Sequence, residues 1–329
     1  MEIKEELIRP AKIFDEYLKL TEIDIKTYFS NVKFVEINCP VCSSKGSTWI
    51  NKSGFNYNMC PKCLSIYVNP RPEINAFNEY YTDSPSTKYW ATTFYKETEN
   101  SRRELLWKPK AKLIKDIIVN NEFGGNIEYI IDIGGGYGVF DEEIEKIMDI
   151  KTIIIEPSLH LAKICRSKGL NVIEKFMEKV EDIDLPSARK CFVSFELFEH
   201  LHDPNFFLST VYDCMKSNDI FVFTTLNGMG LDIQLLREHS KALSPPHHLN
   251  FFNPNSMAEI LKKHGFEIIE INTPGKLDID ILLKNKTLIE DAYWINLLKL
   301  FEKEDLNKLQ KSISDMGLSS HMMISAIKK

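Results

Sequence analysis

Two pairs of cysteines have the spacing that points most directly to chemistry. Cys39 and Cys42 form one C-x-x-C pair, and Cys60 and Cys63 form a second pair after seventeen intervening residues. Each pair can direct two thiolates at one tetrahedral cation, and residues 48–58 between them have the pattern of a β-hairpin. Together they predict a zinc ribbon. Because four thiolates fill the coordination sphere of Zn²⁺, we expect a structural metal.

A nucleic-acid-binding module is the alternative interpretation of such a ribbon. The residues between the cysteine pairs include Lys45 and Lys52 but no arginine, and the whole chain carries a formal net charge of −6. Nucleic-acid-binding domains usually carry a basic excess. The charge therefore argues against a nucleic-acid partner and favours a scaffold role for the ribbon.

A glycine-rich turn is the second feature with chemical meaning. Branched apolar residues dominate 128–133 and predict a buried strand, and the apolar spacing over 139–147 predicts a helix. Gly134, Gly136 and Gly138 lie between them, where the lack of a Cβ permits a sharp turn and the close approach of a ligand. This order places backbone N–H groups at a helix N-terminus, a common site for nucleotide-like ligands.

Two further residues narrow the choice of ligand. Val139 occupies the third-glycine position of the dinucleotide fingerprint, which disfavours a nicotinamide cofactor. Glu156 follows a second predicted strand, residues 152–155, and a carboxylate there can accept hydrogen bonds from both hydroxyls of a ribose. Glycine-rich turns also serve phosphates, flavins or structure alone, so the turn by itself leaves the ligand open.

With both motifs, the chain resembles the class I S-adenosylmethionine (SAM)-dependent methyltransferases. Their first motif has the form Asp-x-Gly-x-Gly-x-Gly, which here runs from Asp132 to Gly138, and their second is the acidic residue numbered Glu156, with Pro157 beside it. The resemblance implies that the glycine turn packs under the methionine and ribose of SAM. It also implies that Asp132 orients the loop or the amino group of the cofactor.

The resemblance places four more residues around the cofactor. Phe176 and Met177 follow the third predicted strand, where related enzymes contact adenine, although Phe176 could equally be a core residue. Phe195 and Glu196 end the fourth predicted strand and are expected beside the methionine end of SAM. An E-H-L-x-D-P run over residues 199–204 resembles the motif that closes the pocket at the switch point of the sheet.

Three histidines are candidates for proton transfer. By the resemblance, His200 lies near the transferring methyl group, and His247 and His248 belong to a P-x-H-x-N-x-F run that lines the acceptor side. A histidine that titrates near neutrality can take a proton from a hydroxyl as it attacks the methyl group. His248 is the first candidate for general base and His247 the second, and each could instead only cap or pack.

An aromatic segment precedes the glycine turn. Its rings are more often core than cofactor box in general. However, related enzymes place helices over the cofactor at this position, and a sulfonium is attracted to aromatic faces. Tyr81 and Trp90 are therefore candidates for a lid over SAM.

A doubly wound α/β sheet is needed to bring these residues together. The expected fold is a Rossmann-like methyltransferase sheet of seven strands, whose last strand, residues 321–327, is inserted antiparallel at the edge beside the sixth, 266–271. Helices are expected at 112–120, 158–168, 256–264, 280–284 and 290–314. Two short helices are also expected near the N-terminus. The expected modules are a helical arm (1–34), the zinc ribbon (35–70), an aromatic helical cap (71–108) and a methyltransferase domain (109–329) with lid insertions at 225–253 and 276–318.

Composition sets the broad class. Hydrophobic residues make up 43% of the chain, and no apolar run reaches the roughly 18 residues of a membrane span. The first residues are charged and lack the apolar core of a secretion signal, so we expect a cytoplasmic location, where cysteines serve as thiols or metal ligands. Oligomeric state has no sequence signal here.

The acceptor is predicted by resemblance alone. A four-cysteine module ahead of such a domain occurs in bacterial methyltransferases of sugar and polysaccharide pathways, which implies a small carbohydrate-linked acceptor, namely a sugar hydroxyl of a nucleotide-sugar or surface glycan. The sugar C-methyltransferases among them carry a further C-terminal domain beyond the seventh strand, so their particular reaction is not carried over. The alternatives are C- or N-methylation of another small metabolite, and a non-catalytic zinc-ribbon binding module on a SAM-fold scaffold.

Overall fold

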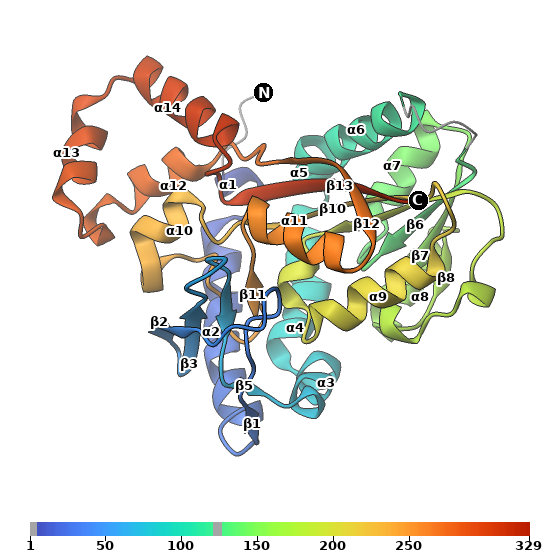
Figure 1. Ribbon diagram of the computed structural model, residues 1–329, viewed down its shortest axis with the longest axis horizontal. Helices are drawn as coiled ribbons and strands as arrows, with labels where there is room; N and C mark the ends of the chain where they lie inside the picture. The colour runs from blue at the N-terminus through green and yellow to red at the C-terminus, as the bar shows by residue number, and fades with distance from the viewer. Residues whose placement is uncertain (1–4, 121–126) are drawn as a thin grey trace.

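A seven-stranded sheet forms the centre of the molecule (Figure 1). The computed structural model describes residues 5–120 and 127–329. The strand order is β12-β13-β10-β9-β6-β7-β8, with β13 antiparallel to both of its neighbours and the other pairs parallel. This confirms the expected doubly wound α/β fold. The strands are β6 (Tyr129–Ile133), β7 (Lys151–Ile155), β8 (Asn171–Ile173), β9 (Lys190–Phe195), β10 (Ile220–Leu226), β12 (Phe266–Asn272) and β13 (His321–Lys328).

The strand order reverses between β6 and β9. From β6 the chain runs outward through β7 and β8, then crosses back to β9 and continues to β10 on the other side. Ile133 pairs with Ile155 of β7, and Asp132 pairs with Val193 of β9, so the carboxyl ends of these three parallel strands meet at one edge. In open α/β sheets, ligands bind at such a switch point.

The alternation of the last strand had suggested a position at the edge of the sheet, and this expectation is wrong. β13 lies between β10 and β12, and its residues 322–327 are all buried. A strand with neighbours on both sides and cover on both faces needs a nearly continuous apolar run, which this segment has. The edge strand on this side is β12, most of whose residues are exposed or half-buried.

Helices cover both faces of the sheet. One face packs against α6 and α7, with Ile114 and Phe140 in the same core as Ile130 of β6. The other packs against α9 and α11, with Phe207 and Met257 in the core. The helices here are α6 (Lys108–Val119), α7 (Val139–Ile147), α8 (Leu159–Ser167), α9 (Pro204–Cys214) and α11 (Pro254–Lys263), with short 3₁₀ helices η3 (Met177–Lys179), η4 (Asp182–Asp184) and η5 (Phe198–His200).

An almost unbroken helical run leads into the sheet. Residues 85–119 are helical throughout but contain two π-helical turns, and the run crosses the expected module boundary after residue 108 without interruption. Its parts are α4 (Pro85–Tyr89), η1 (Trp90–Phe94), α5 (Tyr95–Arg102), η2 (Arg103–Trp107) and then α6, and it follows α3 (Ile74–Asp83). Such π turns often occur at functional sites.

The N-terminal arm consists of α1 (Glu5–Ile8) and α2 (Ala11–Tyr28). The expectation of two short helices is therefore only partly right, because its second pattern continues α2 to Tyr28. Asp24, which is buried, accepts a hydrogen bond from the backbone N–H of Ser86, at 2.8 Å. Buried Phe14 and Tyr17 pack with Phe94. The arm is thus attached to the cap.

The predicted ribbon hairpin is present. β2 (Ser47–Lys52) pairs with β3 (Phe55–Met59), and β4 (Ile66–Val68) and β11 (Asn250–Phe251) complete a four-stranded sheet in the order β11-β4-β3-β2. A segment from after β10 therefore belongs to the sheet of the ribbon. A small pair of strands, β1 (Phe34–Val35) and β5 (Arg71–Pro72), lies beside it.

A group of helices with its own core projects from the end of the main sheet (Figure 1). It contains α10 (Leu231–Leu236), α12 (Asp278–Lys284), α13 (Ala292–Leu300) and α14 (Lys303–Asp315), with 3₁₀ turns η6 (Arg237–His239) and η7 (Lys286–Leu288). The single helix expected over 290–314 is wrong, because Phe301 and Glu302 adopt extended backbone between α13 and α14. Within residues 5–120 and 127–329, no helix combines the length and apolar character needed to cross a membrane.

Candidate active site

A cavity of about 2140 Å³ lies at the switch point of the sheet. Ligand sites typically measure about 300–1,000 Å³, so this one has room for two ligands. It brings together every predicted cofactor and catalytic residue except Gly138. These lining residues are Tyr81, Asp132, Gly134, Gly136, Glu156, Pro157, Phe176, Met177, Phe195, Glu196, His200, His247 and His248.

The glycine loop connects β6 to α7, and its glycines have different neighbours. Gly136 has a φ of +57°, and a Cβ there would lie 3.3 Å from the hydroxyl of Tyr95 on the cap. Gly138 has a φ of +66°, and its Cβ would lie 2.5 Å from Cδ1 of Leu170, away from the cavity. Gly136 therefore keeps the floor of the cavity open, whereas Gly138 allows close packing of the loop on the chain behind it.

Glu156 is held at the tip of β7 by two backbone donors. The N–H of Gly136 donates to Oε2 at 3.2 Å, and the N–H of Ser158 donates to Oε1 at 2.8 Å. The side chain is nevertheless buried, and burial raises the pKa of Glu156 to about 7 despite these bonds. The carboxylate thus has a fixed orientation beside the glycine loop, as expected for an acceptor of ribose hydroxyls.

Asp132 is the second-last residue of β6 and lies next to the glycine loop. Its Oδ2 would be 2.7 Å from a Cβ at position 135, so Gly135 also permits close contact. Burial, together with the nearby carboxyls of Asp141 and Glu156, raises the pKa of Asp132 well above its usual range. A cationic group placed here would stabilise the ionised form.

Glu196 is the anionic group at the end of β9. Its Oε1 accepts a hydrogen bond from Thr224 Oγ1 at 2.7 Å and lies 3.4 Å from His321 Nδ1 and 3.8 Å from Lys110 Nζ. Burial alone would raise the pKa of Glu196, but His321, Lys110 and the Thr224 hydrogen bond lower it to about 2. It therefore carries a negative charge at neutral pH.

Phe195, next to Glu196, contributes an aromatic wall. Its ring centre lies 4.9 Å from that of Phe140 and 6.0 Å from that of Trp107, and Lys110 Nζ lies 4.5 Å from it. Phe176 and Met177 line the cavity further along, at η3. Met177 is almost fully buried, whereas Phe176 is 41% exposed, so Phe176 is not a core residue.

The three predicted histidines form one cluster. The ring centres of His200 and His248 are 4.7 Å apart, and those of His200 and His247 are 6.2 Å apart. Nε2 of His247 is hydrogen bonded to the hydroxyl of Tyr80 at 2.6 Å. Nδ1 of His248 lies 2.6 Å from the carbonyl oxygen of Ala242. Because a carbonyl only accepts, Nδ1 of His248 carries the proton and Nε2 keeps its lone pair.

Burial shifts the pKa of all three histidines away from the near-neutral value of a free imidazole. Burial lowers the pKa of His200 to about 4 and that of His248 to about 3, and it lowers the pKa of His247 well below its usual value. All three rings are therefore neutral at pH 7. A neutral imidazole can accept a proton or bind a cation, and a negative charge brought nearby would raise its basicity.

Several lining residues were not predicted from the sequence. Glu199, next to His200, is buried, accepts a hydrogen bond from Thr225 Oγ1 at 2.8 Å, and has a pKa raised to about 8 by burial and by Glu196. Arg102 of the cap is half-buried, and its Nε has no hydrogen-bond partner among the described residues. Glu199 belongs to the run over residues 199–204 that was noted for other reasons, and no sequence pattern indicates that the side chains of Glu199 and Arg102 face the cavity.

The predicted lid residues differ in what they contact. Tyr81 lines the cavity with its ring centre 5.9 Å from that of His247. Trp90 also lines the cavity, but it stacks on Phe94 at 3.9 Å. The ring that covers the glycine loop is Tyr95, which stacks on Tyr137 at 5.1 Å. The two π turns lie on either side of α5, the helix that begins with Tyr95. The position of this ring therefore depends on backbone irregularities that helical periodicity does not predict.

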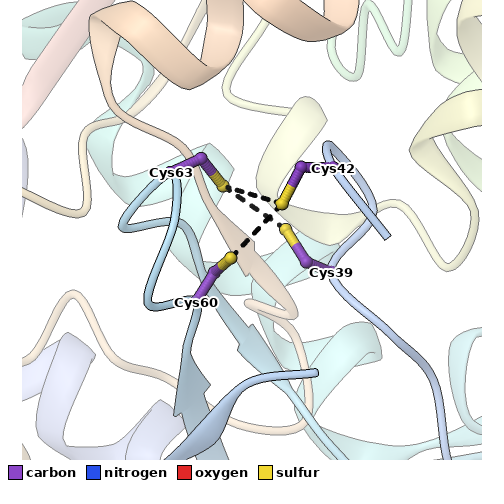
Figure 2. A group of neighbouring side chains, drawn as sticks. All are labelled: Cys39, Cys42, Cys60 and Cys63. Carbon is purple, nitrogen blue, oxygen red and sulfur yellow. Dashed lines mark hydrogen bonds between the residues drawn. The ribbon is translucent and has the colours of Figure 1, made fainter. Parts of the chain in front are cut away.

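The four predicted metal ligands form a compact cluster (Figure 2). Their sulfur atoms all lie within 4.8 Å of one another, with 3.4 Å between Cys39 and Cys63 and 3.4 Å between Cys42 and Cys60. Short donor-to-donor distances of this kind suit tetrahedral thiolate coordination of Zn²⁺. The four residues therefore fit a structural metal.

The two cysteine turns have the same construction. Ser43, with a φ of +58°, donates its N–H to the carbonyl of Cys39, and Leu64, with a φ of +59°, donates to that of Cys60. The side-chain amide of Asn253 also donates to the carbonyl of Cys63, at 2.7 Å. None of the four cysteines is among the described residues that line the cavity. Within the described residues, the cluster therefore lies outside the lining of the cavity.

Comparison with known proteins agrees with this geometry. A model of a methyltransferase domain matches residues 96–271. No curated protein matches the chain in sequence. Solved structures that are similar include a SAM-dependent methyltransferase from Thermotoga maritima described as a possible histamine N-methyltransferase, with 18% identity, a TM-score of 0.45, and coverage of 72% of this chain and 98% of that one.

Two further structures have comparable similarity. A SAM-dependent methyltransferase from Archaeoglobus fulgidus has 19% identity and a TM-score of 0.46, covering 72% of this chain and all of that one. Phosphoethanolamine N-methyltransferase 2 of Haemonchus contortus has 15% identity and a TM-score of 0.49, covering 80% and 62%.

The family assignment rests on the matched domain. Residues 96–271 make up more than half of the 329-residue chain and include the glycine loop, Glu156 and the residues that follow β9. The chain therefore belongs to the methyltransferase domain family, and the protein is a SAM-dependent methyltransferase.

Proposed function

We propose that the enzyme transfers the methyl group of SAM to a hydroxyl group of a small carbohydrate-linked acceptor, such as a nucleotide-sugar or surface glycan. The observation that carries the proposal is that the histidine cluster lines the same cavity as the glycine loop and Glu156. One ligand can thus lie on the loop while a second meets an imidazole with a free ring nitrogen.

In this proposal the cofactor lies along the carboxyl ends of β6, β7 and β9. Glu156 accepts hydrogen bonds from the ribose hydroxyls, and Asp132 accepts a hydrogen bond from the amino group of the cofactor. Phe176 and Met177 pack against the adenine. Bound SAM supplies an electrophilic methyl group on a sulfonium. The charge of Glu196 and the ring of Tyr95 favour a cationic centre between them.

The proton of the acceptor is assigned to His248, with His247 as the second candidate. Nε2 of His248 would take the proton of the acceptor hydroxyl as that oxygen accepts the methyl group, and bound SAM would supply the methyl group and retain the sulfur electron pair. Ala242 fixes the tautomer of His248 because its carbonyl oxygen accepts a hydrogen bond from Nδ1–H, with 2.6 Å between the nitrogen and the oxygen. Most of the remaining catalysis is positioning of the two reactants.

Two observations support a large, partly anionic acceptor. The cavity of about 2140 Å³ exceeds what one ligand needs. Arg9 and Lys241, which line it, both lie over the ring of Phe14, at 4.8 and 5.4 Å from its centre. Cations beside an aromatic ring suit a phosphorylated sugar. The four cysteines are proposed to hold Zn²⁺ as a scaffold for this part of the protein.

An acceptor screen tests the proposal. The purified enzyme is incubated with SAM carrying a ¹³C-labelled methyl group and with a panel of nucleotide-sugars, sugar phosphates, amines and small acids. Mass spectrometry detects the added methyl group, and its ¹³C chemical shift distinguishes transfer to oxygen, carbon or nitrogen. O-methylation of a sugar that is lost in His248→Asn supports the proposal. Turnover confined to amines or acids would contradict it.

A further inference from the structure

We propose that Glu199, His200 and His248 form a binding site for a divalent transition-metal cation inside the cavity, separate from the four-cysteine cluster. One carboxylate oxygen and one ring nitrogen from each histidine lie within 4.8 Å of one another. All three side chains line the cavity. Modest side-chain rotation would bring the donors to the roughly 2.0–2.2 Å metal–ligand distances of such sites.

The donors are preoriented by groups behind them. Thr225 Oγ1 donates to Oε2 of Glu199 at 2.8 Å, which leaves the other carboxylate oxygen available. The Ala242 carbonyl accepts a hydrogen bond from Nδ1–H of His248, which leaves Nε2 free to act as a ligand. Metal-binding histidines and carboxylates are usually held by hydrogen bonds of this kind.

A cation would complement the buried carboxyl group of Glu199. Glu199 is only 1% exposed. The charge of Lys110 acts on it, but Lys110 Nζ forms its ion pair with Glu196, at 3.8 Å. Its neighbours in the cluster are imidazoles. A buried carboxyl group without a compensating charge tends to stay protonated, and a bound cation would stabilise its ionised form.

The donor set indicates the class of cation. Two imidazoles and one carboxylate are used by zinc enzymes and by Fe(II) enzymes that keep open coordination positions, and Mn²⁺ also accepts them. The four-cysteine cluster, in contrast, offers only soft thiolates, which select Zn²⁺. The chain would therefore hold two different metal sites.

The role of the cation rests on the proposed function, although its binding does not. An open coordination position facing the cavity would bind the acceptor hydroxyl and make its proton more acidic. The O–H proton would then pass to His247, the second candidate base, because His248 would be a ligand. The oxygen would form its bond to the methyl carbon, and the electron pair of the C–S bond would remain on sulfur.

Titration with Mn²⁺ tests the site without SAM or acceptor. The protein is first treated with a mild chelator, and zinc analysis confirms that the four-cysteine cluster remains loaded. Free Mn²⁺ is then followed by electron paramagnetic resonance for the wild type, His248→Asn, Glu199→Gln and the control His264→Asn. His264 directly follows α11 and is hydrogen bonded to Ser209 and Asn205.

We expect one Mn²⁺ site per chain in the wild type and in His264→Asn, and at least a tenfold loss of affinity in the other two variants. Equal binding by all four proteins, or no binding by the wild type, would overturn the proposal. If the two variants fail to fold, nitrogen modulation in the pulsed spectrum of wild-type Mn²⁺ decides: coupling to two imidazoles supports the site and its absence refutes it. A failed acceptor screen would leave this result unchanged.

Discussion

Replacing Glu156 by glutamine tests how the cavity recognises its cofactor. The carboxylate is held by the backbone N–H groups of Gly136 and Ser158 and is buried. Glutamine keeps one acceptor oxygen at nearly the same volume but removes the charge. The change keeps the side-chain volume but sets an NH2 group against one of the two backbone N–H donors, so it tests the carboxylate with its backbone contacts.

The size of the effect follows from two hydrogen bonds. Bonds to a charged group contribute about 1.5–3 kcal/mol, against about 0.5–1.5 kcal/mol for neutral ones. Two bonds that each lose about 1 kcal/mol weaken binding of S-adenosylhomocysteine by about 2 kcal/mol, or about thirtyfold. Glu174→Gln is the matched control, because Glu174 pairs with Arg166 at 2.8 Å and is not among the residues that line the cavity.

The same residue predicts a pH dependence. Because burial raises the pKa of Glu156 to about 7 in the free protein, ionisation needed for binding becomes unfavourable as the pH falls through that value. One pH unit below it, roughly one tenth of the protein is ionised at this residue, so the apparent Kd rises about tenfold. The affinity is then restored above pH 7.

Isothermal titration calorimetry between pH 5.5 and 8.5 measures both effects. We expect the wild type and Glu174→Gln to lose affinity toward low pH, and Glu156→Gln to bind weakly with a much flatter profile. A wild-type affinity independent of pH, or Glu156→Gln binding as tightly as the wild type, would refute the assignment of this carboxylate to the ribose.

Three further predictions concern stability. Gly138→Ala would place a Cβ 2.5 Å from the side chain of Leu170, whereas the control Gly169→Ala, also at positive φ, meets nothing within 4 Å. In urea unfolding, Gly138→Ala should be less stable than this control by about 1–3 kcal/mol. Equal stability of the two variants would contradict the packing role of Gly138. Asp219→Asn removes the buried partner of Lys190, at 3.3 Å, and should cost about 3–5 kcal/mol of unfolding free energy, with Lys190→Met restoring part of it in the double variant. Cys60→Ser should lower both the zinc content and the melting temperature, because structural zinc sites contribute folding energy; retention of both would argue against a structural metal.

Much of the site could be predicted because its residues are close in sequence or follow strand ends. The glycine loop and Glu156 each come directly after an apolar strand, and adjacent parallel strands place their tips together, as the pairing of Ile133 with Ile155 confirms. The four cysteines form two local turns, so their clustering needs only one hairpin between them. In both cases local patterns decide the geometry.

Other features depend on packing between distant segments. Tyr95 and Arg102 reach the cavity through a helical run with two π turns, and a regular helical period does not describe that run. β11 pairs with β4, which joins Phe251 to the ribbon sheet across almost the whole chain. The lowered pKa values of the clustered histidines come from burial, which depends on the complete fold.

The most direct test of the account is the structure of the enzyme with S-adenosylhomocysteine bound. We predict that the ribose hydroxyls meet Glu156, that the adenine lies against Phe176 and Met177, and that the sulfur faces the side of the cavity lined by His200 and His248. The account would be contradicted if the ligand occupied another part of the molecule, or if its sulfur pointed away from these histidines.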